Sequence, residues 1–220
     1  MSTRSLLCVV MMVLTLPATA QRNWTFELHG GVVGNMRLPL VIRQAGYPVI
    51  RIPKAHFVSE PLVDPFYWDW RFSRWFNNQG IEFEAIHHKL YLVNKPPEVQ
   101  RFGISHGYNM VMVNYLKKWK GFYYRIGAGK ILLHPENTIR NRAFPEGPGF
   151  DIRGYYLRGW VINGGLARKV PITPWLYGSF EAKVTASAAD VPIVEGLARI
   201  YNVAFQGIFG VGVYFGKKSE

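Results

Sequence analysis

The last long stretch of the chain, Arg199 to Phe215, alternates between two kinds of side chain. Every second residue on one face is apolar or glycine: Val203, Phe205, Gly207, Phe209, Val211, Val213 and Phe215. A period of two residues predicts a β-strand with two different faces. The apolar face can cross a bilayer, since a tilted transmembrane strand needs about 9–11 residues and a soluble strand usually has about 5–6. We therefore expect this strand to close a barrel in a membrane.

The N-terminus predicts a secretory signal peptide over residues 1–20. Arg4 supplies the positive charge, Leu6 to Leu16 form an apolar core, and Ala18 to Ala20 form a cleavage site. The core is too short for a membrane anchor, which needs about 20 residues. The chain's single cysteine, Cys8, lies inside this core. The mature domain, residues 21–220, is therefore expected to contain no disulfide.

No other stretch predicts a transmembrane helix, because polar residues interrupt the apolar ones every one or two positions. A membrane protein without such helices has to be a closed barrel, since only closure satisfies every backbone polar group in lipid. Aromatic residues make up 15% of the chain and it has 22 glycines, which suits strands and barrel packing. The predicted fold class is all-β.

Six further segments alternate in a similar way, and a seventh, residues 151–163, alternates less cleanly, so eight strands are expected. They are residues 23–33, 67–76, 81–91, 101–115, 122–134, 151–163 and 176–186. The expected connections alternate between long ones (34–65, 92–99, 134–149, 188–196) and short ones (77–80, 116–120, 165–172). Long extracellular loops and short periplasmic turns are typical of up-and-down transmembrane barrels. The proline-rich segment 34–65 is interpreted as a large first extracellular loop that can include a hairpin extending the barrel wall. Asn77 to Gly80 is expected to form a tight turn in which the glycine adopts positive φ.

In these features the chain resembles the small eight-stranded outer-membrane β-barrel proteins of Gram-negative bacteria. The signal sequence, the cysteine-free mature part, the alternating strands and the aromatic last strand carry the resemblance. It implies an outer-membrane location and contact with membrane lipid, and we expect a monomer. The chain departs from the class at its end, because Gly216 to Glu220 follow the terminal aromatic Phe215 that is read during assembly.

Charged residues lie on the faces expected to point into the barrel. They are Glu27, Glu82, Glu84, Arg125, Glu181 and Lys183, with Arg71 as a further candidate. An eight-stranded barrel is just wide enough for side chains to fill it. An unpaired charge there would be costly, so a packed ion network is favoured over a polar pathway or pore.

Four histidines fall at the expected extracellular ends of neighbouring strands: His87, His88, His106 and His134. The segment Ile104 to Asn109 is faintly similar to the H-x-S-N motif of outer-membrane lipid A deacylases, which pair a histidine with a serine nucleophile. His106 and Asn109 match, but Tyr108 stands where the serine should be. His106, Ser105 and Glu136 are the candidate catalytic residues, although Ser105 is expected to point to the opposite face from His106.

The remaining rim histidines, His87, His88 and His134, are candidates for binding, or they only straddle lipid and water as aromatic side chains do. We expect no metal site, because His87 and His88 cannot point to one face and no spacing completes a ligand set. No cofactor is expected.

The chain carries a formal charge of +12, and removing Arg4 leaves 12 − 1 = 11 positive charges on the mature part. This balance favours anionic partners, but no nucleic-acid-binding motif is present. Arg37, Arg43 and Arg51 lie in the expected first loop. Arginine pairs with phosphate through two hydrogen bonds, so these residues are candidates for binding lipopolysaccharide phosphates, against ordinary solvated loop charge.

These observations favour a structural or surface-binding role in the outer leaflet. One alternative is an outer-leaflet lipid-modifying hydrolase similar to the lipid A deacylases. A second alternative is a soluble periplasmic lipocalin-like binding barrel. That alternative predicts polar outward faces, and the apolar face of residues 203–215 argues against it.

Overall fold

The computed structural model describes residues 23–145 and 154–216. The expected signal peptide, residues 1–20, and the tail after Gly216 lie outside the described residues, as do residues 146–149 of the expected connection 134–149 and residues 151–153 of the expected strand 151–163. Within the described part, the chain forms a single antiparallel sheet of 13 strands. The strands are β1 (Trp24–Asn35), β2 (Leu38–Gln44), β3 (Ile50–Ala55), β4 (Phe57–Val58), β5 (Trp68–Phe76), β6 (Gln79–His87), β7 (Leu90–Leu92), β8 (Val99–Trp119), β9 (Phe122–Ile139), β10 (Arg142–Ala143), β11 (Tyr156–Pro171), β12 (Leu176–Ile193) and β13 (Gly196–Phe215).

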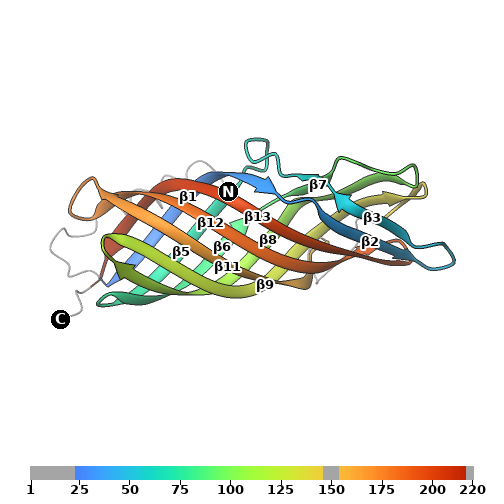
Figure 1. The fold of residues 1–220 in the computed structure, drawn as a ribbon. Helices are drawn as coiled ribbons and strands as arrows, with labels where there is room; N and C mark the ends of the chain where they lie inside the picture. Colours follow the sequence, from blue (N-terminus) through green and yellow to red (C-terminus); the bar gives the residue numbers. More distant parts are fainter. Residues whose placement is uncertain (1–22, 146–153, 217–220) are drawn as a thin grey trace.

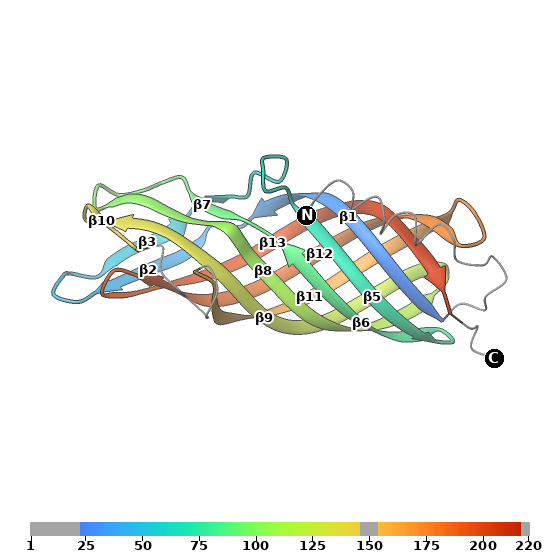
Figure 2. The same cartoon turned by 180° about the vertical axis from the view of Figure 1, so that it is seen from behind.

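Eight of these described strands close a hydrogen-bonded ring in the order β1-β5-β6-β8-β9-β11-β12-β13. The ring closes where β1 pairs with β13, from Trp24 opposite Phe215 to Asn35 opposite Ala204. Figures 1 and 2 show the strands tilted around an elongated barrel. The predicted eight-stranded antiparallel barrel is confirmed. We call the end near Trp24 and Phe215 the closing end, and the opposite end, where β2 and β3 lie, the hairpin end.

The expected first loop is not a loop over most of its length. β2 and β3 form a hairpin that pairs with β13 and extends the barrel wall at the hairpin end (Figure 1). The hairpin considered within residues 34–65 is therefore present, and the part of this segment after β4 (Phe57–Val58) has no strand. The strand tolerates Pro53 because β3 pairs only with β2 and so lies at a sheet edge.

Other connections also differ from the prediction. The expected loops 134–149 and 188–196 are largely strand, because β9 continues to Ile139 and β12 to Ile193. The expected turn 165–172 is also strand, since β11 continues to Pro171. In the turn after β5, Asn77 has φ of 55° and Gly80 belongs to β6. Asparagine takes this role because its short polar side chain tolerates the left-handed region.

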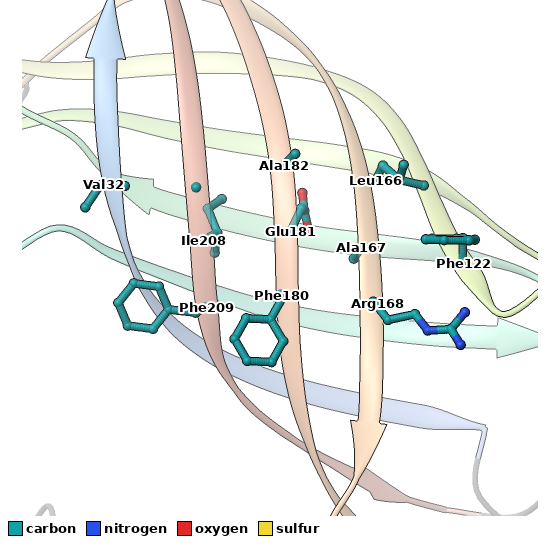
Figure 3. A pocket seen from close by; sticks show the side chains of 11 residues that line it. Val32, Phe122, Leu166, Ala167, Arg168, Phe180, Glu181, Ala182, Ile208 and Phe209 are labelled. Atoms are coloured by element: carbon teal, nitrogen blue, oxygen red, sulfur yellow. The ribbon is translucent and has the colours of Figure 1, made fainter.

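The outward face of the barrel is apolar between two levels of aromatic residues. Figure 3 shows Phe180 and Phe209 side by side on neighbouring strands, with Val32 and Leu166 on either side. Exposed aromatics mark the closing end at Phe76, Trp119 and Phe122, and the other level at Trp68, Trp160 and Tyr201. We call the surface between these levels the apolar belt. Such a belt, flanked by aromatic girdles, is typical of a barrel surrounded by lipid. It argues against the soluble lipocalin-like alternative.

Inside the belt, the barrel is filled by an ion network. Arg71 is fully buried, with Nε 2.7 Å from Glu84 Oε1 and Nη1 2.7 Å from Glu181 Oε2, and it also pairs with Asp69. Arg125 donates to Glu82 at 2.9 Å, and Lys183 pairs with Glu84. The seven inward charges expected from the sequence are all buried. Because water does not reach these side chains, the prediction of a packed ion network is confirmed, and the alternative of an open polar pathway is not.

Toward the hairpin end the interior changes from charged to apolar. Buried side chains of the hairpin and of the long strands pack together there, among them Leu40, Ile52, Phe102, Ile131 and Ile200. This core holds together the part of the barrel that extends beyond the apolar belt. Among the described residues, no helix has the length and apolarity needed to span a membrane.

Candidate functional site

A bulge in β8 brings His106 toward β9. Ile104 lies opposite Pro135, but the next paired residue on β8 is Tyr108, opposite Leu133. Four steps along β8 therefore face two steps along β9. Gly107 has φ of +136°, and a Cβ there would lie 2.5 Å from Asn109 Cγ, so the bulge requires glycine. The bulge breaks the alternation, which is why His106 is exposed whereas Ile104 and Tyr108 are buried, contrary to their shared parity in the sequence.

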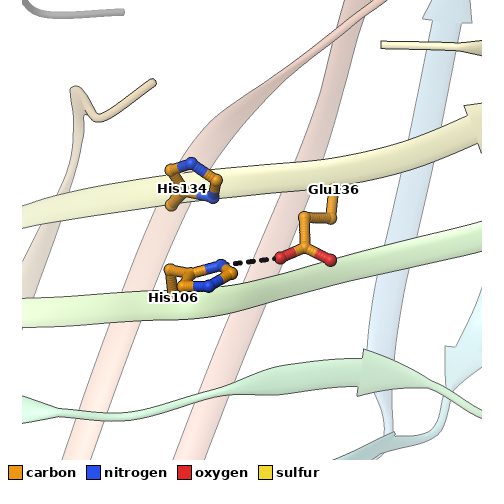
Figure 4. A group of neighbouring side chains, drawn as sticks. All are labelled: His106, His134 and Glu136. Atoms are coloured by element: carbon orange, nitrogen blue, oxygen red, sulfur yellow. Dashed lines mark hydrogen bonds and ion pairs between the residues drawn. The ribbon is translucent and has the colours of Figure 1, made fainter. Parts of the chain in front are cut away.

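His106, His134 and Glu136 form a cluster at this bulge, which we call the rim cluster (Figure 4). His106 Nδ1 lies 2.8 Å from Glu136 Oε1, and the two imidazole rings meet edge to face with centroids 5.0 Å apart. His134 and Glu136 are two residues apart on β9, so they share a face of that strand. The side chain of His106 is 63% exposed and that of Glu136 only 9%. The cluster is therefore open to solvent on the histidine side.

Ser105 also contacts the rim cluster, although the sequence predicts that it points away from His106. Its Oγ lies 3.2 Å from His106 Nδ1. Ser105 is nevertheless buried whereas the His106 side chain is 63% exposed, so the two side chains leave the strand on different faces, as expected. The contact still does not make a serine–histidine–acid relay, since Ser105 and Glu136 approach the same ring nitrogen. In a relay, the nucleophile and the acid use opposite nitrogens of the imidazole.

Two further side chains support the rim cluster. Arg101 forms an ion pair with Glu136 through the second carboxylate oxygen. Tyr155 donates its hydroxyl to the backbone carbonyl of His106 at 2.8 Å, and its ring packs on His134 with centroids 5.1 Å apart. The cluster is thus held from β8, β9 and the segment before β11. Tyr108, which occupies the serine position of the deacylase-like motif, is buried in the core and donates to Ser187.

His87 and His88 do not join the rim cluster. His87 Nδ1 lies 2.7 Å from Asn109 Oδ1 and its ring stacks on Trp68. His88 follows the end of β6, is buried, and lies 3.1 Å from Ser59 Oγ. Burial lowers the pKa of His88 to about 3. His88 is therefore neutral at physiological pH and offers no charge to an anionic ligand.

The three arginines expected in the first loop are all exposed. Arg37 lies between β1 and β2, while Arg43 and Arg51 project outward from β2 and β3. Val41 lies opposite Arg51 and also opposite Arg199 of β13, so the hairpin arginines share a surface with the wall of the barrel. Within the described part of the chain, neither Arg43 nor Arg51 forms an ion pair.

A basic groove at the edge of the apolar belt was missed by the sequence analysis. Lys130, Trp160, Ala188 and Tyr201 form one row across four paired strands. The next row toward the hairpin end contains Arg158, Asp190 and Arg199. Together these residues line a groove, which we call the basic groove, with the small Ala188 among them. Trp160 is 65% exposed, and Lys130 Nζ lies 3.1 Å from its ring centroid.

Charges in the basic groove are partly neutralised by one acid. Arg199 donates from Nε and Nη2 to the two oxygens of Asp190, at 2.8 and 2.6 Å. These hydrogen bonds and the nearby Arg158 and Arg43 hold the pKa of Asp190 below its usual range, so Asp190 stays ionised. The basic groove therefore contains three cations, Lys130, Arg158 and Arg199, and one carboxylate, Asp190. The alternation of its strand predicts that Lys130 points outward. The sequence does not show which residues of the three neighbouring strands lie beside it.

No family model matches the chain, and a search of curated proteins finds no relative. Among solved structures, the chain is similar to the solid-state NMR structure of outer membrane protein AlkL in DMPC lipid bilayers. The TM-score is 0.53 at 10% identity over 90% of this chain and 92% of that one. It is more distantly similar to OprG from Pseudomonas aeruginosa, with a TM-score of 0.43, 12% identity and coverage of 90% and 98%. Ail of Yersinia pestis gives a TM-score of 0.37 at 10% identity, covering 89% and 99%. The chain therefore has the fold of the small eight-stranded outer-membrane β-barrel proteins.

Proposed function

We propose that this protein resides in the outer membrane of a Gram-negative bacterium as a monomer and binds anionic lipid headgroups of the outer leaflet. The phosphates of lipopolysaccharide are the foremost ligand. The observation that carries the proposal is the basic groove, in which Lys130, Arg158 and Arg199 surround a single acid beside exposed aromatic rings. This is a surface-binding role of the kind that the sequence favours.

The position of the basic groove supports a lipid ligand. The groove lies where the apolar belt ends, since Trp160 and Tyr201 belong to the aromatic level and Arg158 and Arg199 to the next row of the wall. Tryptophan and tyrosine prefer the boundary between hydrocarbon and headgroups. In the proposed orientation the hairpin end faces outside, because the ring begins at Trp24 and ends at Phe215 at the closing end, where the short turns after β5, β8 and β11 also lie. A lipid headgroup then lies level with the three cations.

The chemistry of the basic groove suits a phosphate. Arg158 presents a planar guanidinium that pairs with phosphate through two hydrogen bonds, and Lys130 adds a point charge. Asp190 keeps Arg199 directed along the wall but leaves the groove with net positive charge. Arg43 and Arg51 continue the positive surface onto the hairpin. Acyl chains of the same lipid would lie against the apolar belt below.

The proposal predicts weaker lipid binding when the groove loses charge. In the double variant Lys130→Gln/Arg158→Gln, the affinity for bisphosphorylated lipid A is expected to fall at least tenfold. That fold-change corresponds to about 1.4 kcal/mol, which is less than two charge-assisted contacts supply. Native mass spectrometry of the protein in detergent, titrated with lipid A, measures the change. Lipid A without phosphates is expected to bind the wild type as weakly as the intact lipid binds the variant.

The matched control is Lys120→Gln/Arg168→Gln, which removes the same residue types near the other edge of the apolar belt. Lys120 lies in the turn between β8 and β9, and Arg168 lies on β11. This control is expected to retain wild-type binding. Equal losses in both double variants would mean that net charge alone attracts the lipid, and the basic groove would not be the site.

A second candidate function is the lipid-modifying hydrolase, favoured by the contact of Ser105 with His106 and of His106 with Glu136. The shared ring nitrogen opposes it, as does the burial of Ser105. We therefore expect mass spectra of lipid A from cells with and without the protein to show the same acyl pattern. A missing acyl chain that returns in the Ser105→Ala and His106→Ala variants would establish the hydrolase instead.

A further inference from the structure

We propose that the rim cluster binds a divalent transition-metal ion of the Zn²⁺ type. The ligands are one imidazole nitrogen each from His106 and His134 and one carboxylate oxygen from Glu136. These three ligand atoms lie within 4.8 Å of one another. The site is independent of the basic groove and of lipid binding.

The fold gathers these ligands from two strands. His134 and Glu136 project from the same face of β9, and the bulge of β8 delivers His106 opposite them. The sequence predicts no metal site, because the bulge cannot be read from the residues before the strands are paired. The signal that could have been used is the spacing of His134 and Glu136, two residues apart on one strand, which places both on one face.

The ligand set selects the class of ion. Two imidazoles and one carboxylate with an open fourth position are typical of zinc sites, at ligand distances of about 2.0–2.2 Å. Ligand atoms around a tetrahedral ion are then about 3.4 Å apart. Separations of up to 4.8 Å therefore have to shorten by as much as about 1.4 Å, while His106 Nδ1 and Glu136 Oε1, now 2.8 Å apart, have to separate slightly. The exposed His106 side chain has room to rotate for this. Imidazole ligands disfavour Ca²⁺ and Mg²⁺, which prefer oxygen, and Cu²⁺ is expected to bind more tightly than Zn²⁺.

The side chains around the rim cluster affect how tightly it binds the ion. His106 Nδ1 gives up its hydrogen bond to Glu136 Oε1 when the ion takes that place. Arg101 stays paired with the other carboxylate oxygen and repels the ion, so the wild-type affinity is held down. Tyr155 fixes the backbone at His106 through its hydroxyl. Solvent reaches the open position, since His106 is exposed.

The test is calorimetric titration of ZnCl₂ into the detergent-purified protein carrying no polyhistidine tag. His106→Ala, His134→Ala and Glu136→Gln are each expected to weaken binding at least tenfold. His56→Ala removes a histidine that lies outside the cluster and is expected to leave the affinity unchanged. Arg101→Gln is expected to tighten binding several-fold, because it removes the competing cation. A heat-dependent mobility shift checks that every variant is folded.

Electron paramagnetic resonance with Cu²⁺ adds a readout of the ligands themselves. Coupling to two imidazole nitrogens is expected in the wild type, and to one in either histidine variant. Unchanged zinc affinity in the three ligand variants would overturn the proposal, as would an equal loss in His56→Ala. Weaker binding in Arg101→Gln would show that Arg101 assembles the site rather than competing for it, and would contradict the electrostatic argument.

Discussion

Replacing Arg71 with methionine is expected to lower the free energy of unfolding by about 3–5 kcal/mol, because the substitution leaves buried carboxylates without their cation. Arg71 lies at the centre of the interior ion network and contacts Asp69, Glu84 and Glu181. Methionine preserves much of the side-chain volume, so the loss reports charge more than packing. These carboxylates are buried, so bulk solvent does not stabilise their charge.

Urea unfolding of the protein in detergent or lipid vesicles, followed by tryptophan fluorescence, measures this loss. Arg74→Met is the matched control, because Arg74 lies on the same strand but packs outside over the ring of Trp24. We expect the control to change stability by less than about 1 kcal/mol. If Arg71→Met fails to fold, the milder Glu181→Gln is expected to fold with reduced stability, since Asp69 and Glu84 still pair with Arg71. Equal losses of unfolding free energy in Arg71→Met and Arg74→Met would contradict the argument that the interior ion network stabilises the barrel.

The barrel and its charged interior could be predicted because both depend on a period of two residues. In lipid, outward residues have to be apolar and inward ones can be polar, so β1, β12 and β13 alternate clearly. This is why Glu27 and Lys183 were assigned inward correctly. The order of the strands was also predictable, because an up-and-down ring pairs each strand with those next to it in the sequence.

The hairpin end could not be predicted in the same way. Beyond the apolar belt the outward residues face water, so the pattern reverses: Ile52, Val191 and Ile193 point inward to an apolar core. Their outward neighbours, such as Pro53 and Asp190, are typical of loops. The residues 188–196 were therefore interpreted as a loop, although they form the end of β12 and a tight turn.

The two sites depend on contacts between strands that the sequence does not place. The rim cluster needs the β8 bulge, which inserts extra residues at Ser105 to Gly107 and rotates His106 toward β9. The basic groove needs the register of β9, β11, β12 and β13 together. The alternation within one strand shows which face of the sheet a side chain lies on. It does not show which residues of the neighbouring strands lie beside it. The expected binding residues Arg43 and Arg51 were thus found exposed, while Lys130 and Arg158 were overlooked.

Replacing Gly212 with valine is expected to open the barrel at its closing strand pair. Gly212 lies on β13 opposite both Glu27 of β1 and Tyr177 of β12. The ring of Tyr177 occupies the space that a side chain at 212 would fill, with Tyr177 Oη 2.5 Å from the position of a Cβ. Tyr177 reaches across the glycine to donate to Glu27 Oε1 at 2.6 Å. A larger residue displaces the ring and leaves Glu27 without this bond.

The loss is expected to be about 3 kcal/mol or more, since overpacking costs about 1–3 kcal/mol and the lost hydrogen bond to the charged Glu27 adds to it, although Lys169 still pairs with Glu27 Oε1. Gly30→Val is the matched control on the same strand pair. Gly30 faces outward opposite Phe209, and nothing lies within 4 Å of the position of its Cβ. Valine suits a strand better than glycine, so this variant should fold at least as well as the wild type. The heat-dependent mobility shift and urea unfolding compare the two. Wild-type stability of Gly212→Val would contradict this argument. It would show that the Tyr177 ring can move without a loss of stability and that backbone pairing alone holds β1 and β13 together.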